Sequence, residues 1–324
     1  MMEMYPMQSG QARQALGGDA IFDLVREDLL CVETAIAIES AVSVGAVTPI
    51  SKYLQPSGGN RVRAALLLLC ARFAGGGGSR MAIQLGAVVE MLHAASLVHD
   101  NAIDMALTRS SVLAGDWLYI CAFRVALQER VLDIVIGAAQ MMVVGELVQL
   151  DGIGRIGTTE ADCMELVDRK TACLFSVCGK LGAVAGGVDT RDGEKLAEFA
   201  WNVGMAFQLV HDMLDFSSRE SAPGKPPGGD LKEGRVTLPL VYALEQASVS
   251  ERKLVAGVLR DRSYDSVPFA SVQVLVDRYG GNRRTRARAR QFTDRARQIV
   301  AEFPDSAWRR ALFRVTDLVT EGQC

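Results

Sequence analysis

The chain has 324 residues, of which 49% are hydrophobic, so it is long enough to bury a large core. The net charge of −3 argues against a general nucleic-acid-binding protein. The seven cysteines show no metal-ligand spacing such as C-x-x-C and are typical of small core residues in a reducing compartment.

The N-terminal part of the chain predicts neither a signal peptide nor a membrane anchor. Residues 1–18 are expected to form a flexible segment, and residues 1–11 lack the charged and then apolar pattern of a secretion signal. The most apolar stretch, residues 131–150, is interrupted by Asp133, Gln140 and Glu146, so it is not expected to span a membrane. We therefore expect a cytoplasmic protein.

The spacing of proline and of apolar residues predicts an all-α protein. No proline occurs between Pro56 and Pro223, and apolar residues in this interval recur at helical spacing. Typical helix lengths predict roughly ten or more helices. Breaks are expected at residues 49–59, 75–79, 152–159, 186–192, 217–234 and 280–282. No long polar linker divides the chain, which favours a single helical domain over residues 1–324.

The first candidate binding element is basic. Residues 58–63 have the sequence GGNRVR at the expected start of a helix. Backbone amides and arginines at a helix N-terminus make an anion site, although this run is also compatible with ordinary surface charge.

The first aspartate pair lies in residues 99–104, with the sequence HDNAID. Asp100 and Asp104 are four apart, so they share one helix face. An isolated pair of this kind is usually a solvated surface, but here the neighbours are apolar. Buried carboxylates need a positive partner, and Mg²⁺ carrying a phosphate substrate fits oxygen ligands. We interpret His99 as a core residue, whereas for His93 a core and a functional role are equally compatible with the pattern.

A second aspartate pair follows after a basic helical run, Arg169-Lys170-Thr171, which by itself also fits surface charge. Asp212 and Asp215 are three apart, on a polar stripe with Phe207, Gln208 and His211. Residues 224–230, with the sequence GKPPGGD, then predict a loop whose amides and Lys225 suit phosphate, although a plain turn is the alternative. The arginine-rich residues 283–290 are interpreted as a solvated helix face, with contact to anionic lipid as the weaker alternative.

The order and spacing of these motifs resemble those of the trans-isoprenyl diphosphate synthases, or polyprenyl synthetases, from about residue 20 to the C-terminus. The resemblance implies a single bundle of α-helices around a deep cavity, with the two aspartate motifs facing each other across its mouth. It also implies Mg²⁺, an allylic prenyl diphosphate and isopentenyl diphosphate. The family ionises the allylic diphosphate by electrostatic stabilisation, and isopentenyl diphosphate then extends the chain by one isoprene unit.

The resemblance assigns roles to individual residues. The implied metal ligands are Asp100, Asp104, Asp212 and Asp215. Lys170, Thr171, Gln208 and Lys225 are expected near the allylic diphosphate and the carbocation, and Arg109 is expected on the allylic diphosphate. The isopentenyl diphosphate site is expected to include Gly59, Asn60, Arg63 and His93.

The sequence departs from the family pattern at five places. Asn101 replaces the middle aspartate of the first motif, Asn60 replaces a lysine, and Arg235 replaces a lysine with its charge retained. His211 replaces the first aspartate of the second motif, and this change is the most damaging because neutral imidazole binds Mg²⁺ poorly. After Arg109, the family's second arginine and a loop of more than ten residues have no counterpart, so either the protein lacks this loop or the sequence is incomplete at this point.

Small side chains below the first aspartate pair favour a medium or long product. In the family, bulky residues one turn below the first aspartate stop chain growth. Here Ala95 and Ser96 occupy those positions, so the cavity floor is expected deeper, at Met91, Met141 or Met142. A bulky residue from a neighbouring helix is the alternative.

Three functions fit these motifs. The first is an active prenyltransferase that makes a medium- or long-chain trans-polyprenyl diphosphate, which is the one we favour. The second is a non-catalytic regulatory subunit in a heteromer with a homologous subunit. The third is a terpene-cyclase-like enzyme that ionises a prenyl diphosphate without isopentenyl diphosphate. By resemblance we expect a homodimer, with at most peripheral contact to a membrane.

Overall fold

The computed structural model describes residues 18–41, 61–76, 78–104, 109–217 and 227–322, while the side chains of residues 18–20, 101–104 and 109–111 lie outside this description. Every described element of regular structure is a helix. In chain order these are α1 (Gly18–Asp23), α2 (Arg26–Glu39), α4 (Val62–Phe73), α5 (Arg80–Asp104), α6 (Arg109–Gln128), α7 (Leu132–Gly152), α8 (Glu160–Val167), the π-helical turn η2 (Asp168–Ala172), α9 (Cys173–Gly186), α10 (Thr190–Asp215), α11 (Gly229–Lys232), α12 (Leu238–Leu244), α13 (Val249–Asp261), α14 (Phe269–Arg278), α15 (Gly281–Ala301) and α16 (Ala307–Glu321).

Short polar side chains begin several of these helices. Thr159 and Asp162 form a capping box at the start of α8, and Ser248 and Glu251 form another at the start of α13. Asp189 caps α10 by accepting a hydrogen bond from the backbone of the third residue after it. These side chains fix the helix starts because the first N–H groups of a helix have no partner within it.

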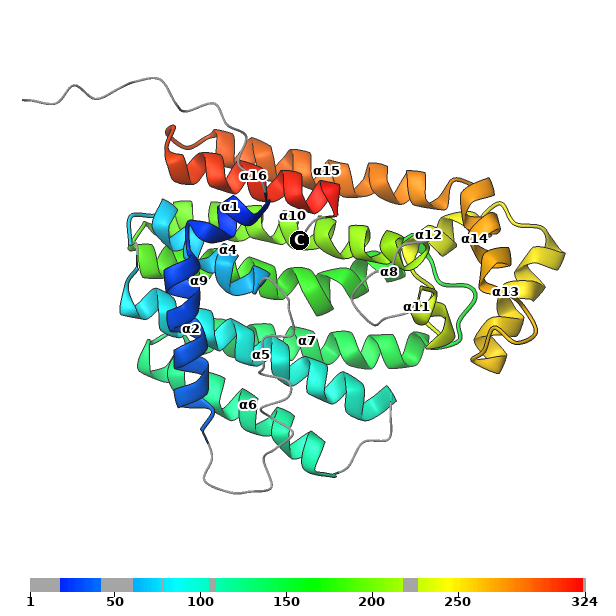
Figure 1. The fold of residues 1–324 in the computed structure, drawn as a ribbon, viewed down its shortest axis with the longest axis horizontal. Coiled ribbons are helices and arrows are strands. Elements are labelled where there is room, and N and C mark those ends of the chain that lie inside the picture. Colours follow the sequence, from blue (N-terminus) through cyan, green and yellow to red (C-terminus); the bar gives the residue numbers. More distant parts are fainter. Residues whose placement is uncertain (1–17, 42–60, 77, 105–108, 218–226, 323–324) are drawn as a thin grey trace, which may run out of the picture.

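The helices are arranged so that both aspartate motifs reach the same end of the bundle. Helix α10 packs between α9 and α15, and α5 packs against both α4 and α6. In Figure 1, α15 and α16 form an outer layer at the top, and α5 and α10 both run toward the right-hand end. The C-terminal turns of α5 and α10, which carry the aspartates, therefore end on one side of the molecule.

Most predicted breaks overlap a junction between two helices. The junctions α4–α5, α7–α8, α9–α10 and α14–α15 fall at the predicted breaks 75–79, 152–159, 186–192 and 280–282, and the short α11 lies inside the predicted break 217–234. The predicted break at 49–59 lies outside the described residues, as does nearly all of the N-terminal segment 1–18. The junction between α6 and α7 was not predicted. Arg130 makes this turn with φ of 60°, a conformation that glycine favours, so the usual sequence signal is missing.

Buried apolar side chains form one cluster that runs through the bundle, with Phe175 and Phe199 among its largest members. Among the helices that the structure describes, two, α5 and α7, contain segments long and apolar enough to cross a membrane by length and composition. In α5 this segment is 72% buried, as expected for a core helix of the bundle. In α7 only 28% is buried, so this helix presents an apolar face to the outside of the chain.

Candidate active site

The first aspartate motif forms an ion pair with a lysine from another helix. Lys170 Nζ lies 2.9 Å from Asp100 Oδ2 and 2.8 Å from the Glu146 carboxylate. It also donates to Gln149 Oε1 at 3.1 Å. Because Glu146 and Gln149 are three apart on α7, they share one helix face. Oxygen atoms from α5 and α7 thus surround a single ammonium group on η2.

Lys170 and Thr171 lie on the π-helical turn that joins α8 to α9. Such turns are rare and are found frequently at functional sites. Gly145 allows α7 to approach this turn closely, since a Cβ atom at this position would lie 3.2 Å from the Lys170 backbone nitrogen. The sequence predicted a helix here, but the π-helical turn was not predicted. The turn places the ammonium group of Lys170 beside α5 and the hydroxyl of Thr171 beside α10.

A chain of hydrogen bonds links Thr171 to the second aspartate motif. The Thr171 hydroxyl donates to Gln208 Oε1 at 2.9 Å, and Gln208 Nε2 donates to Asp212 Oδ1 at 2.8 Å. Thr171 and Asp212 are both buried. Gln208 and Asp212, which were predicted to share a polar stripe on α10, are thus connected to Thr171 of η2, with Gln208 as the link.

The environment of Asp212 favours its protonated form. Burial, followed by the charge of Asp230, raises the pKa of Asp212 to about 7. The hydrogen bond from Gln208 and the charge of Arg235 act in the opposite direction but are weaker. Burial, followed by the neighbouring Asp100 carboxyl, also raises the pKa of Glu146, whereas Lys170 acts in the opposite direction and favours the carboxylate.

Asp215 anchors the segment that follows α10. Its carboxylate accepts hydrogen bonds from the backbone nitrogens of Gly229 and Asp230 at 3.1 and 3.3 Å, and its own carbonyl accepts one from Gly228 at 2.9 Å. Arg235 then donates to Asp230 at 2.8 Å. The second motif is thus joined to α11 and the residues after it.

Arg63 and His93, predicted for the second substrate, lie near each other behind the first motif. The Arg63 guanidinium is 5.2 Å from the centre of the Phe175 ring, and its Nε has no hydrogen-bond partner among the described residues. Burial, and next the charges of Arg63, Arg61 and Lys170, hold the pKa of His93 well below 6.5. His93 is therefore neutral at pH 7 and sits among cationic groups, an environment that attracts an anion.

Two acidic residues that the sequence did not indicate hold this basic region in place. Arg61 donates to Glu33 at 2.5 Å and lies 3.3 Å from the buried Glu90. Glu90 also accepts a hydrogen bond from the Ala64 backbone at 3.0 Å. Arg61 adopts a left-handed conformation with φ of 40° at the start of α4. These contacts fix the direction in which α4 begins, and so the position of Arg63 two residues later.

His99 lies at the contact between α5 and α6. Its Nε2 is 3.2 Å from Asp116 Oδ1 and from the Val112 carbonyl, and its ring packs on Tyr119. The side chain is 25% exposed, so His99 is a hydrogen-bonded boundary residue, and the interpretation as a core residue holds only in part. Gly115 makes room for the ring, because a Cβ atom there would lie 2.3 Å from Nε2.

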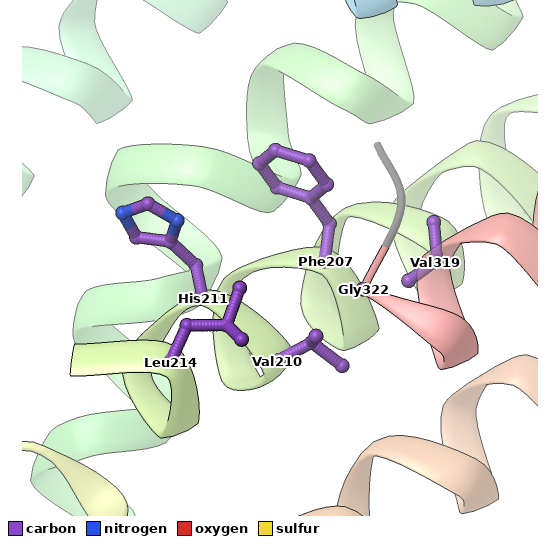
Figure 2. Close-up of a pocket in the computed structure, with 6 residues that line it drawn as sticks. All are labelled: Phe207, Val210, His211, Leu214, Val319 and Gly322. Carbon is purple, nitrogen blue, oxygen red and sulfur yellow. The ribbon is translucent and has the colours of Figure 1, made fainter. Parts of the chain in front are cut away.

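His211 faces a small cavity between α10 and the end of α16. Its side chain lines this cavity of about 20 Å³ with Phe207, Val319 and Gly322 (Figure 2). This volume accommodates about one water molecule. Within the predicted polar stripe on α10, Gln208 bonds to Thr171 of η2 and to Asp212, and His211 lines this cavity with Phe207.

The residues expected to control product length lie deep in the bundle. Met91 and Ala95 are fully buried in α5, and Ser96 is buried with its hydroxyl donating to the His93 carbonyl at 2.9 Å. Met142 of α7 is also buried, and Met141 packs against the core. The position of the cavity floor stays a prediction.

Several predicted residues cannot be located in the site. Gly59, Asn60 and Lys225 lie outside the described residues, as do the side chains of Asn101, Asp104 and Arg109. Within the described part of the chain, three or more metal-binding side chains do not converge on one point. Asp100 Oδ1 is buried and accepts no hydrogen bond from a described residue. Such a carboxylate oxygen fits a hard cation, so the donors present are compatible with Mg²⁺.

Comparisons with known proteins identify a matching family. Residues 45–272 match the family described as Polyprenyl synthetase. The octaprenyl diphosphate synthase of Haemophilus influenzae is 31% identical over 322 residues, which cover 93% of this chain and 95% of that protein. The all-trans-nonaprenyl-diphosphate synthase (geranyl-diphosphate specific) of Rhodobacter capsulatus is 31% identical over 315 residues, covering 92% and 95%.

Solved structures show the same fold. The polyprenyl synthase from Caulobacter crescentus CB15, complexed with calcium and isoprenyl diphosphate, is 29% identical, with a TM-score of 0.86 over 95% of this chain and 99% of that one. The decaprenyl diphosphate synthase structure from Rhodobacter capsulatus gives a TM-score of 0.84 at 29% identity, covering 94% and 98%. The predicted all-α isoprenoid synthase fold is confirmed, and the chain belongs to the polyprenyl synthetase family of prenyltransferases.

Proposed function

We propose that this protein condenses an allylic prenyl diphosphate with isopentenyl diphosphate, using Mg²⁺, to make a medium- or long-chain trans-polyprenyl diphosphate. The proposal is supported first by one feature of the site, the ion pair of 2.9 Å between Asp100 and Lys170. A carboxylate for a metal and an ammonium for a phosphate thus lie side by side, as transfer from a diphosphate substrate requires.

The described residues have separate roles in such a reaction. Lys170 is placed to bind an oxygen of the allylic diphosphate and to stabilise negative charge as the diphosphate leaves. Thr171 and Gln208 orient each other through their hydrogen bond, and both are placed near the allylic diphosphate. Arg63 and neutral His93 are placed to hold the second diphosphate, whose charge would also provide Arg63 with a partner. The apolar residues around them exclude water from a carbocation.

Asp100 together with Asp104 would hold the metal, with Asp212 and Asp215 on the facing motif. When bound, a divalent cation neutralises the diphosphate and makes it a better leaving group. The unpaired Oδ1 of Asp100 supports this assignment for the first motif. The names of the relatives, octaprenyl and nonaprenyl diphosphate synthases, support a product of similar length, and the small Ala95 agrees with it.

A product assay tests the proposal directly. Purified protein is incubated with Mg²⁺, farnesyl or geranylgeranyl diphosphate, and labelled isopentenyl diphosphate, and the lipid products are separated by length. We expect a series of longer prenyl diphosphates that ends at one main product. Folded protein that incorporates no label would contradict the proposal, and cyclised or hydrolysed products without isopentenyl diphosphate would indicate the cyclase-like alternative.

We also propose that two copies of the chain associate through α6 and α7. Leu113, Ile120 and Leu127 are spaced seven apart on α6 and are each more than half exposed. On α7 the apolar residues Ile136, Val143, Leu147 and Leu150 are also at least one-third exposed. These exposed apolar residues lie on two helices that contact each other, rather than scattered singly over the surface, and two copies of the chain can bury them symmetrically.

Light scattering after size-exclusion chromatography tests this association. Wild-type protein is expected at twice the mass of the chain, and Leu147→Glu at the mass of a single chain. Val274→Glu is a matched control, because Val274 is 55% exposed but lies on α14. A monomeric wild type, or a dimeric Leu147→Glu variant, would contradict the proposed interface.

The regulatory-subunit alternative keeps some support. His211 and Asn60 depart from the family pattern, and one relative is named heptaprenyl diphosphate synthase component 2, from Geobacillus stearothermophilus, at 28% identity over 306 residues. If the purified chain is inactive alone but becomes active when mixed with a homologous chain from the same source, this alternative replaces the first proposal.

A further inference from the structure

Glu146 is the acidic residue of the site for which the sequence motifs gave no role. Its side chain is 13% exposed, and Lys170 Nζ lies between its two oxygens and Asp100 Oδ2, at 2.8 to 3.0 Å from each. Lys170 is therefore shared between two carboxylates, one on α5 and one on α7. Of these two, only Asp100 belongs to an aspartate motif.

A metal bound at Asp100 would change which anionic groups can pair with the Lys170 ammonium group. A divalent cation bound to this carboxylate would compete with the ammonium for the same oxygens and would repel it. Lys170 is largely buried, with 24% of its side chain exposed, so it requires another anionic partner nearby. Glu146 and Gln149 already contact Nζ, at 2.8 and 3.1 Å, and can retain it without a movement of the backbone.

We propose that Glu146 is a positioning residue that holds Lys170 in place when Asp100 binds a metal. Glu146 thereby lowers the competition between Lys170 and the metal for Asp100. The close approach of α7 at Gly145 fixes the distance between Glu146 and the π-helical turn. This inference rests on the proposed metal site at Asp100 and assigns to α7 a role in metal binding that requires no direct contact with the metal.

Binding of Mn²⁺, a paramagnetic ion that also prefers oxygen ligands, tests the inference without an activity assay. Mn²⁺ is titrated into the full-length, metal-free protein, and free Mn²⁺ is measured by electron paramagnetic resonance. Glu146→Gln keeps the shape of the side chain but removes its charge. We expect it to weaken Mn²⁺ binding about tenfold, as loss of a residue behind a metal ligand typically does. Gln149→Leu, which removes the neutral acceptor, should give a smaller loss.

A double variant separates an effect through Lys170 from a direct effect on the metal. In a Lys170→Met background the competitor is absent, so adding Glu146→Gln should leave Mn²⁺ affinity unchanged. Glu165→Gln is the matched control, because this carboxylate pairs with Arg169 on the same helical run and is 51% exposed. Circular dichroism and thermal unfolding show whether each variant is folded.

The possible results distinguish this inference from the proposed function. Unchanged Mn²⁺ affinity in folded Glu146→Gln, or an equal loss in the Lys170→Met background, would overturn the positioning role. If Asp100→Asn then still weakens Mn²⁺ binding, the metal site itself stands. Unchanged affinity in Asp100→Asn would instead overturn both the metal site and the inference that depends on it.

Discussion

The two aspartate motifs have similar spacing in the sequence but opposite electrostatic surroundings. Asp100 lies 2.9 Å from a lysine ammonium, and its other oxygen is buried without a hydrogen-bond partner among the described residues. Asp212 lies near Asp230 and Asp215, and its pKa is raised to about 7. The first motif therefore already has a cationic group beside its carboxylate, whereas at Asp212 of the second motif a proton competes with a metal.

The difference extends to the fifth residue of the second motif. Asp215 accepts hydrogen bonds from the backbone of Gly229 and Asp230, so it anchors the segment after α10. The second motif can thus stabilise the segment after α10 before a metal is bound. From this comparison we expect a metal to bind more readily at the first motif than at the second, and the following predictions test the difference between the two motifs.

Replacing Asp100 should have the largest effect. Asp100→Ala removes the carboxylate beside Lys170, so we expect kcat/KM for isopentenyl diphosphate incorporation to fall on the order of 10²-fold or more. The measurement is the rate of label incorporation at saturating Mg²⁺. Asp116→Ala, on α6 beside His99, serves as a control that keeps the active site. Unchanged turnover in Asp100→Ala would show that this carboxylate is not required for catalysis, and the proposed difference between the two motifs would then be wrong.

Asp212 should make the metal-free protein less stable as the pH rises. Its carboxyl is protonated in the folded state up to a pKa of about 7 but in the unfolded chain only up to about 4. The folded protein therefore binds the extra proton between these values, and the free energy of unfolding falls as pH rises through this window. The loss is at most about 4 kcal/mol between pH 4 and pH 7.

Urea unfolding at several pH values, with a chelator present, measures this effect. Asp212→Asn should lose that part of the pH dependence, since the amide does not titrate. Asp294→Asn, which replaces an exposed aspartate on α15, should retain the full pH dependence. A wild type and an Asp212→Asn variant with parallel pH profiles would show that Asp212 ionises normally and that the two motifs are electrostatically alike.

The sequence predicted well what depends on local spacing. Helical periodicity predicted the helices that carry Asp100, Lys170 and Gln208, and it placed Gln208 and Asp212 on one stripe of α10, where they form a hydrogen bond. Glu146, Gln149 and Glu90 were missed as site residues, because their roles depend on how α7 and α4 approach other helices. In the sequence, Glu146 only interrupted an apolar stretch. The π-helical turn at Lys170 and the left-handed Arg130 also have no clear local signal.

Replacing His211 tests the same difference between the two motifs, with a smaller expected effect. Its imidazole lines the cavity beside α16, at the position where the family has an aspartate. His211→Asp should add an oxygen ligand to the second motif and reduce the Mg²⁺ concentration for half-maximal rate by about tenfold. His211→Asn, without a charge, is the matched control. An unchanged Mg²⁺ requirement in His211→Asp would show that this side chain does not reach the metal.

Ala95 tests whether the first motif also sets product length. Ala95 is fully buried one helical turn before Asp100, and a turn of about 5.4 Å is comparable to one isoprene unit. A phenylalanine here should block chain growth near the diphosphate, so the main product of Ala95→Phe should be shorter while the rate of the first condensation changes little.

Because the site is tightly packed, overpacking is the competing explanation for any loss of product. Ala95→Leu provides a milder increase in volume and should shorten the product less than Ala95→Phe. Thermal unfolding of both variants distinguishes a blocked cavity from a damaged core. If both are folded and active but make the wild-type product, the growing chain does not pass Ala95. The floor would then be formed by another helix, and the role of α5 would be limited to binding the diphosphate.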